Sequence, residues 1–242
     1  MRLVIGHLYP DLFHLYSDRG NVCCLQKRLQ WRGIEAEVTP ILFGERIDFA
    51  GMDILCWGGA SDRGQEMAAG HLPKIRQDFR AYVEDGGVVL AICAAYQLLG
   101  RYYRTEKKKV EGLGVLDICT EWRPGRLVGN IVLESPLFTA PVVGFENHAG
   151  RTEIGEYTPL GNVLFGHGNM GRGDYEGLVY KNVIATYLHG PLLPKNPQIC
   201  DVLLKRALKR RYGREISLDP LPDEEEYRAN RQIAERYTRS SV

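Results

Sequence analysis

Cys93 is the residue of this sequence whose position best suits covalent chemistry. Residues 88–92 form a short apolar run that predicts a buried strand, and residues 94–99 predict a helix. A thiol at such a strand-to-helix turn faces the free N–H groups at the start of the helix, which favour thiolate over thiol. The small residues Ala91 and Ala94 allow a sharp turn. A lone cysteine is usually a buried structural residue, but this setting predicts a nucleophile elbow with Cys in place of Ser.

Two histidines are candidates for the general base that a thiol nucleophile requires. His189 follows the apolar run 183–188 and precedes Gly190-Pro191, so it lies at the end of a predicted strand. A histidine in that place can reach a thiol on a neighbouring strand. His148, in Phe145-Glu146-Asn147-His148, is the rival for this role.

A glycine pair follows another predicted strand. Gly58-Gly59 come directly after residues 53–57. Glycines let backbone N–H groups turn inward, as an oxyanion hole requires. On composition alone, an ordinary tight turn is the simpler interpretation. In open α/β sheets the chemistry lies at the carboxyl ends of the strands, where this loop, Cys93 and His189 would meet.

The elements that must position these residues alternate along the first hundred residues. Ser17-Asp18 offer a helix cap, and Val22, Leu25 and Leu29 share one helical face before the stop at Gly33. We predict strands at residues 2–9, 34–38, 53–57 and 88–92, a polar helix over 63–84, strands within 176–187 and a helix over 197–211. This alternation predicts a three-layer α/β fold: an open, mostly parallel sheet with helices on both faces. Residues 112–168 are rich in glycine, valine and aromatic residues, which indicates an antiparallel or mixed extension.

Composition limits the function classes. The chain has 242 residues, and its 31 Lys plus Arg against 30 Asp plus Glu give no global attraction to nucleic acid or to an anionic membrane. No apolar run approaches the ~20 residues of a membrane span, and we expect a cytoplasmic protein. The six cysteines form no C-x-x-C pair and the histidines are scattered. We therefore expect neither a disulfide framework nor a metal site, and no cofactor.

The C-terminal residues differ from the rest. We divide the chain into a catalytic domain at residues 1–212 and a charged helical tail at 213–242. Acidic residues open the tail and arginines close it, which complements a helix dipole, and Glu224/Arg228 and Glu235/Arg239 are spaced as i,i+4 pairs. A solvated helix is the simpler interpretation, and a partner-binding helix is the alternative.

Five segments in order resemble the cobyric acid synthase-like branch of the class I glutamine amidotransferases. They cover residues 16–21, 58–63, 91–97, 145–148 and 187–191, and the resemblance extends from about residue 2 to residue 210. They are most similar to the GatD-type glutaminase subunits of lipid II isoglutaminyl synthases. Those subunits pair with a MurT-type, Mur-ligase-like subunit. The resemblance implies a cytoplasmic heterodimer for peptidoglycan synthesis, in which ammonia from L-glutamine amidates the D-glutamate of the lipid II stem peptide.

The resemblance also implies roles for individual residues. Cys93 matches the nucleophile, which forms a γ-glutamyl thioester, and His189 matches the general base. Backbone N–H groups near Gly59 and of Ala94 would stabilise the oxyanion. Arg126 matches the arginine that holds the substrate carboxylate, a role that suits its planar guanidinium. Gln97, within the elbow segment, is placed at the substrate site. The sequence has no P-loop motif, so ATP chemistry would reside on the partner.

The sequence departs from many triad enzymes after His189. They carry His-x-Glu, whereas position 191 is Pro. The third triad member therefore stays open between Asp18, Glu146 and a carboxylate from the partner subunit, which we favour. The alternatives to the whole assignment are an amidotransferase for cobyrinic acid, cobyric acid or another acceptor, a different cysteine hydrolase, and a binding module without activity.

Overall fold

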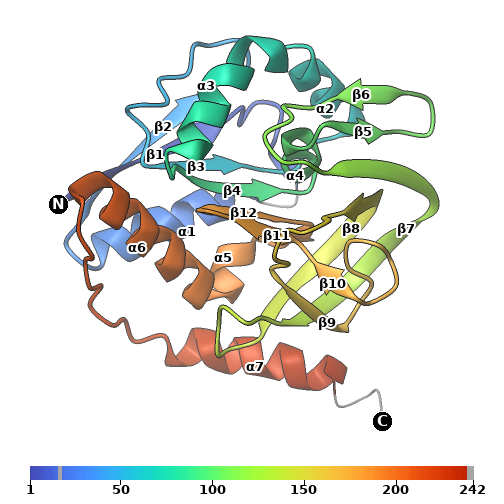
Figure 1. Ribbon diagram of the computed structural model, residues 1–242. Coiled ribbons are helices and arrows are strands. Elements are labelled where there is room, and N and C mark those ends of the chain that lie inside the picture. Colours follow the sequence, from blue (N-terminus) through green and yellow to red (C-terminus); the bar gives the residue numbers. More distant parts are fainter. Residues whose placement is uncertain (16–17, 239–242) are drawn as a thin grey trace.

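The protein contains two β-sheets, which together form one continuous structure (Figure 1). The computed structural model describes residues 1–15 and 18–238. The first sheet has the strand order β11-β12-β4-β3-β1-β2. Its bounds are Arg2–Leu8 (β1), Glu35–Ile41 (β2), Ile54–Trp57 (β3), Val88–Ile92 (β4), Leu178–Tyr180 (β11) and Val183–Thr186 (β12). All neighbours run parallel except β11 and β12, which confirms the mostly parallel sheet predicted from the sequence.

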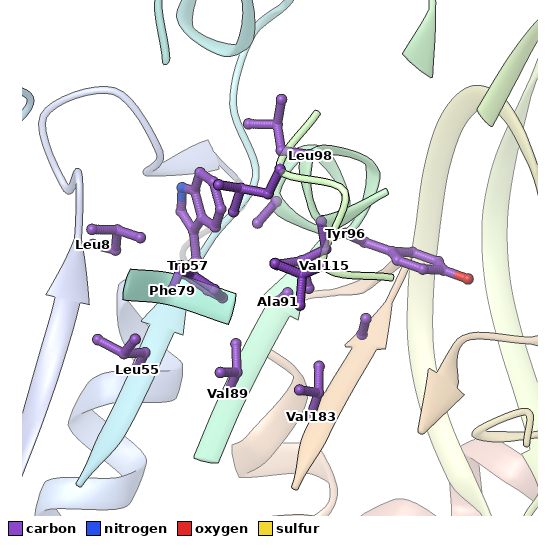
Figure 2. Packing of buried hydrophobic residues seen from close by; sticks show 14 of the residues in the cluster. Leu8, Leu55, Trp57, Phe79, Val89, Ala91, Tyr96, Leu98, Val115 and Val183 are labelled. Carbon is purple, nitrogen blue, oxygen red and sulfur yellow. The ribbon is translucent and has the colours of Figure 1, made fainter. Parts of the chain in front are cut away.

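Helices cover both faces of this sheet. One face packs on α1 (Arg19–Gln30) and α6 (Pro197–Tyr212), through a core that includes Leu3, Ile5 and Leu25. The other packs on α2 (Asp62–Ala69), α3 (Leu72–Glu84) and α4 (Ala94–Leu99), where Trp57, Phe79 and Val89 meet (Figure 2). Because both faces are buried, the central strands are continuous apolar runs rather than alternating ones.

The second sheet is the predicted extension, and it is mixed. It contains β5 (Tyr102–Arg104), β6 (Lys109–Glu111), β7 (Cys119–Glu134), β8 (Val142–Glu153), β9 (Gly161–Phe165), β10 (Tyr175–Glu176) and β13 (Leu188–His189). The two long strands β7 and β8 are antiparallel, with an irregular register between Trp122 and Leu127. β13 pairs with β8, and so it joins the end of the first sheet to the second.

Two predicted helical features differ in the structure. The single helix expected at 63–84 is divided into α2 and α3 around Gly70 and His71, and α3 has a proline in its first turn. A proline is tolerated there because it lacks only an N–H that would have no helical partner. At the start of α1, Asp18 holds the N-cap position but its side chain makes no cap hydrogen bond. Ser17, the other predicted cap, lies outside the described residues.

The C-terminal tail forms a helix that packs on the second sheet. α7 (Glu224–Thr238) contacts β7, β8 and β9, and Ala234 is buried with Val132 and Val143. The prediction of a solvated helix is therefore wrong, because one side of α7 is covered. Arg228 pairs with Glu225 rather than with Glu224, and Arg239 lies outside the described residues. The short helix α5 (Leu192–Lys195) lies between α7 and α1. None of the helices within the described ranges has the length and apolarity needed to cross a membrane.

Candidate active site

Cys93 lies in a strained turn between β4 and α4. Its backbone has φ 54° and ψ −101°, a left-handed conformation that few residues other than glycine adopt. The N–H of Cys93 donates to the Thr186 carbonyl at 2.8 Å, and its carbonyl accepts from Gln97. The turn is therefore fixed on both sides. It presents a partly exposed side chain at the carboxyl end of β4, as an elbow requires.

His189 comes from the neighbouring strand path and is almost completely buried. β12 pairs in parallel with β4, and the chain continues from β12 through Tyr187 into β13. Burial disfavours the charged imidazole. The charge and hydrogen bonding of Cys93 and Asp18 outweigh it and raise the pKa of His189 to about 10. The imidazole thus lies in an environment that favours the imidazolium beside the Cys93 sulfur.

Asp18 supplies a carboxylate to the far side of this imidazole. Its Oδ2 lies 3.3 Å from His189 Nδ1, and its Oδ1 lies 3.5 Å away. Asp18 Oδ2 also accepts a hydrogen bond of 2.8 Å from the backbone N–H of Gly59. This geometry favours an internal third member, Asp18, over the partner carboxylate that we expected from the sequence.

The carboxylate of Glu146, the other internal candidate, faces different groups. Its oxygens accept from the backbone N–H and Nδ1 of His167 at 2.7 and 2.9 Å, and from Gly168 N–H at 3.0 Å. Its Oε2 lies 3.5 Å from His148 Nε2. Burial opposes a charge on Glu146, but the contacts with His148 and His167 lower its pKa. Glu146 is therefore committed to another pair of histidines.

His148 is buried and packed, unlike a mobile base. Its ring stacks on Tyr187 with centroids 3.7 Å apart, and Nδ1 lies 2.8 Å from the Gly150 carbonyl oxygen. Burial lowers the pKa of His148. This residue lines the same pocket as Cys93, but the imidazole that interacts with Cys93 is that of His189.

Gly59 occupies a place where no side chain fits. A Cβ at this position would lie 2.8 Å from His189 Cε1. The N–H of Gly59 itself donates to Asp18, so the expected oxyanion donor near Gly59 would be a neighbouring N–H. The next residue of the loop, Ala60, lines the pocket together with Ala94. Ala94 begins α4, so its N–H has no partner within the helix. Ala60 and Ala94 are the backbone donors that remain for this role.

A pocket of about 540 Å³ opens in front of Cys93 and holds most of the remaining predicted residues. Arg126 lies at its rim. Its Nε donates to Asn147 Oδ1 at 2.8 Å and its Nη2 donates to the Asn147 carbonyl at 3.1 Å. Arg126 forms no ion pair with any carboxylate of residues 1–15 and 18–238. Its remaining N–H groups are therefore available to an anion.

Gln97 lines the same pocket, but its amide is occupied inside the protein. Its Oε1 accepts from Gln65 Nε2 at 2.7 Å, and its Nε2 donates to the Tyr187 hydroxyl at 3.1 Å. The sequence did not indicate Gln65, and it gave no role to Asn147 or Tyr187, although both lie in segments that carry the family resemblance. Their roles arise from contacts between distant segments, and the available signals were the proximity of Asn147 to His148 and of Tyr187 to His189.

Comparisons with known proteins show the family of the chain. Residues 4–197 match the CobB/CobQ-like glutamine amidotransferase domain family. The chain is 43% identical over 238 residues to the GatD subunit of the glutamine-hydrolysing lipid II isoglutaminyl synthase of Staphylococcus aureus, which covers 98% of this chain and 97% of that subunit. The GatD subunit of Streptococcus pneumoniae is 37% identical over 240 residues, or 98% of this chain and 91% of that subunit. A cobyric acid synthase of Listeria innocua is 30% identical, but the match spans only 32% of its length.

Solved structures show the same fold. A glutamine amidotransferase crystal structure superposes on 84% of this chain and 98% of its own, with a TM-score of 0.55 and 19% identity. A glutamine amidotransferase from Thermotoga maritima superposes on 97% of both chains, with a TM-score of 0.53 and 14% identity.

Proposed function

Because the chain belongs to the CobB/CobQ-like glutamine amidotransferase family, we propose that it hydrolyses L-glutamine and delivers ammonia to a synthetase subunit. The observation that carries this proposal is the juxtaposition of three side chains at the carboxyl edge of one sheet. Cys93 follows β4, His189 follows β12, and Asp18 follows β1. A nucleophile, its base and an orienting carboxylate in this order form the constellation that acyl transfer requires.

The proposed reaction has two halves. The Cys93 thiolate attacks the side-chain amide carbon of glutamine, and the N–H groups of Ala60 and Ala94 stabilise the oxyanion. The C–N bond breaks as the His189 imidazolium gives its proton to the departing ammonia, which leaves a γ-glutamyl thioester. Water then loses a proton to His189, attacks the thioester and releases glutamate, and the thiolate returns.

We assign to Arg126 the role of binding the substrate carboxylate. Asn147 fixes the guanidinium with two hydrogen bonds, so its free edge is oriented before substrate arrives. Gln97 and Gly59 are assigned supporting roles. Gln97 forms the pocket wall, and Gly59 gives His189 room and holds Asp18.

The proposed acceptor is lipid II. The relatives that match almost the full chain are named subunits of lipid II isoglutaminyl synthases, whereas cobyric acid synthase is matched over a third of its length. We therefore assign a MurT-type, Mur-ligase-like partner that carries the ATP and lipid II sites and amidates the D-glutamate of the stem peptide. A reducing cytoplasm suits the six free cysteines of this subunit.

The test is glutamine hydrolysis by the purified chain, alone and with the Mur-ligase-like subunit. Because Asp18 lies within this chain, we expect measurable glutamate release by the chain alone, its loss in Cys93→Ser, and its retention in the control Cys23→Ser, a substitution of an exposed cysteine. With the partner, ATP and lipid II, amide-¹⁵N from glutamine is expected in the stem peptide. Hydrolysis that persists in Cys93→Ser contradicts the nucleophile. Hydrolysis that appears only with the partner contradicts an internal triad.

A further inference from the structure

The first turn of α1 holds the chain segment that follows His189. The side chain of Asn21 is almost fully buried, at 2% exposure, and its Oδ1 accepts a hydrogen bond of 2.8 Å from the backbone N–H of Leu193. Leu193 belongs to α5, four residues after His189, and is itself fully buried. No water can replace this acceptor without opening the core, so the N–H of Leu193 depends on Asn21.

A second contact brings the same two segments together. A Cβ added at Gly20 would lie 2.6 Å from Cγ of Pro191, so the α1 backbone fits directly against that ring. Gly20 therefore permits the close approach that lets Asn21 reach Leu193. The residue that replaces the acid of the His-x-Glu pattern, Pro191, is thus the contact point for α1.

Asp18 lies three residues before Asn21, in the same turn of the chain. This turn therefore holds the carboxylate that faces His189 Nδ1 and also the backbone that carries His189. Before His189, the N–H groups of Tyr187 and Leu188 donate to Glu176 and Thr186, and β13 pairs with β8 at Leu188 and His189. After His189, it is Asn21 that holds the N–H of Leu193. We propose that Asn21 is a positioning residue, which sets the distance of the His189 imidazole from Asp18 and from Cys93.

The charged groups around the imidazole determine what a displacement changes. Cys93 acts from the turn after β4 and Asp18 from the start of α1. Lys195 of α5 lies beside Gly190, the residue after His189, since its Nζ is 2.8 Å from where a Cβ of Gly190 would be. If β13 and α5 move away from α1, the imidazolium loses the Asp18 contact, which is one of the interactions that raise its pKa. Its pKa then falls.

The experiment measures the protonation of His189 directly. In protein labelled with ¹³C at histidine Cε1, an NMR titration follows each imidazole, and His189→Ala assigns the resonance. Asn21→Leu removes the acceptor at similar volume. We expect the His189 titration midpoint to fall by about one pH unit or more, and kcat for glutamine to fall about 10- to 100-fold. Asn21→Asp keeps the acceptor oxygen and is expected not to lower the midpoint.

Two comparisons separate positioning from a general loss of stability. Asn182 donates a hydrogen bond of 2.7 Å to the Gly86 carbonyl, far along the sheet from the site, and Asn182→Leu is the matched control. It is expected to lower stability without moving the His189 midpoint. In an Asp18→Asn background, Asn21→Leu is expected to add little further loss of kcat, because both act on one pair. If Asn21→Leu does not fold, Asn21→Ser is used, because its shorter side chain cannot reach Leu193.

An unchanged His189 midpoint in the folded Asn21 variant overturns the proposal, as does full additivity with Asp18→Asn. The inference rests on the proposed glutaminase, but the titration needs no activity. Failure of the wild-type chain to hydrolyse glutamine, alone and with its partner, would count against the proposed function. A His189 titration midpoint that does not change in the Asn21 variants would count against the positioning role.

Discussion

The imidazole of His189 lies between the Cys93 sulfur and the Asp18 carboxylate, and these two groups determine whether it is protonated. Burial opposes the charge, yet Cys93 and Asp18 raise the pKa of His189 to about 10. In the proposed mechanism the imidazolium protonates the departing ammonia, and this form is present below about pH 10 and is lost above it. We predict an alkaline limb of kcat/KM near that pH. In Asp18→Asn the limb moves to lower pH, and kcat falls about 10²- to 10⁴-fold. A pH–rate profile of the two proteins checks this, and an unmoved limb would remove Asp18 from the triad.

The two candidate bases are expected to separate by mutation. His189→Ala removes the base next to Cys93, and we predict no detectable thioester formation. His148→Ala removes the stack on Tyr187, the contact with Glu146 and the hydrogen bond at the Gly150 carbonyl, so measurable hydrolysis should remain. Rapid-quench assays of the two variants measure this difference. Reversed phenotypes would transfer the base role to His148.

A substitution at Arg126 tests whether this residue binds the substrate carboxylate. In Arg126→Lys the charge is kept, but the planar donor set that Asn147 orients is lost. We predict a rise in KM for glutamine that corresponds to about 1–3 kcal/mol, with a smaller effect on kcat. Steady-state kinetics measure this, with Arg123→Lys on the same strand as the control. An unchanged KM would place the substrate carboxylate elsewhere.

The sequence singled out the proposed reacting residues because each ends a strand. Cys93 and His189 follow apolar runs, and the ends of neighbouring parallel strands meet at one edge. The carboxylate that interacts with His189 could not be identified from the sequence in this way. Asp18 lies 171 positions away from His189, and its side chain serves Gly59 and His189 rather than the helix that it begins. The role of the Gly59 N–H depends on that same contact and could not be seen beforehand.

At the scale of elements, α7 contributes to stability through a few residues. The Tyr237 hydroxyl accepts a hydrogen bond of 2.7 Å from Asn130 Nδ2, and its ring lies 4.9 Å from that of Phe165. We predict that Tyr237→Ala lowers the free energy of unfolding by about 1–3 kcal/mol. Urea denaturation measures this, with the exposed Arg231→Ala as the control. Equal stability of the two variants would show that α7 adds nothing to the fold.

Element boundaries followed the local signals only where those signals were strong. Gly33, which has a positive φ of 66°, lies three residues after the last residue of α1, Gln30, so the glycine marked this end to within one turn. The break between α2 and α3 was missed because the apolar spacing continues through Gly70. The covered face of α7 was missed because charged residues dominate its composition, and only tertiary packing buries Asn230 and Ala234.

At the scale of the whole molecule, the site depends on the union of two sheets. Cys93 is carried by the parallel sheet, Arg126 and Asn147 by β7 and β8 of the mixed sheet, and His189 by the short strand that joins them. The class of the parallel sheet was predictable from strand–helix alternation. The join through β13 was not, because a two-residue strand has no pattern of its own.

The central claim is that Cys93 forms a covalent bond to the side-chain carbonyl carbon of glutamine. The most direct measurement is incubation of the chain, alone and with its Mur-ligase-like partner, with the glutamine-analogue electrophile diazo-oxo-norleucine, followed by peptide mapping. We predict one adduct on Cys93, prevented by excess L-glutamine and absent in Cys93→Ser. An adduct on Cys23 or Cys56 in its place, or no adduct with the partner present, would contradict the account.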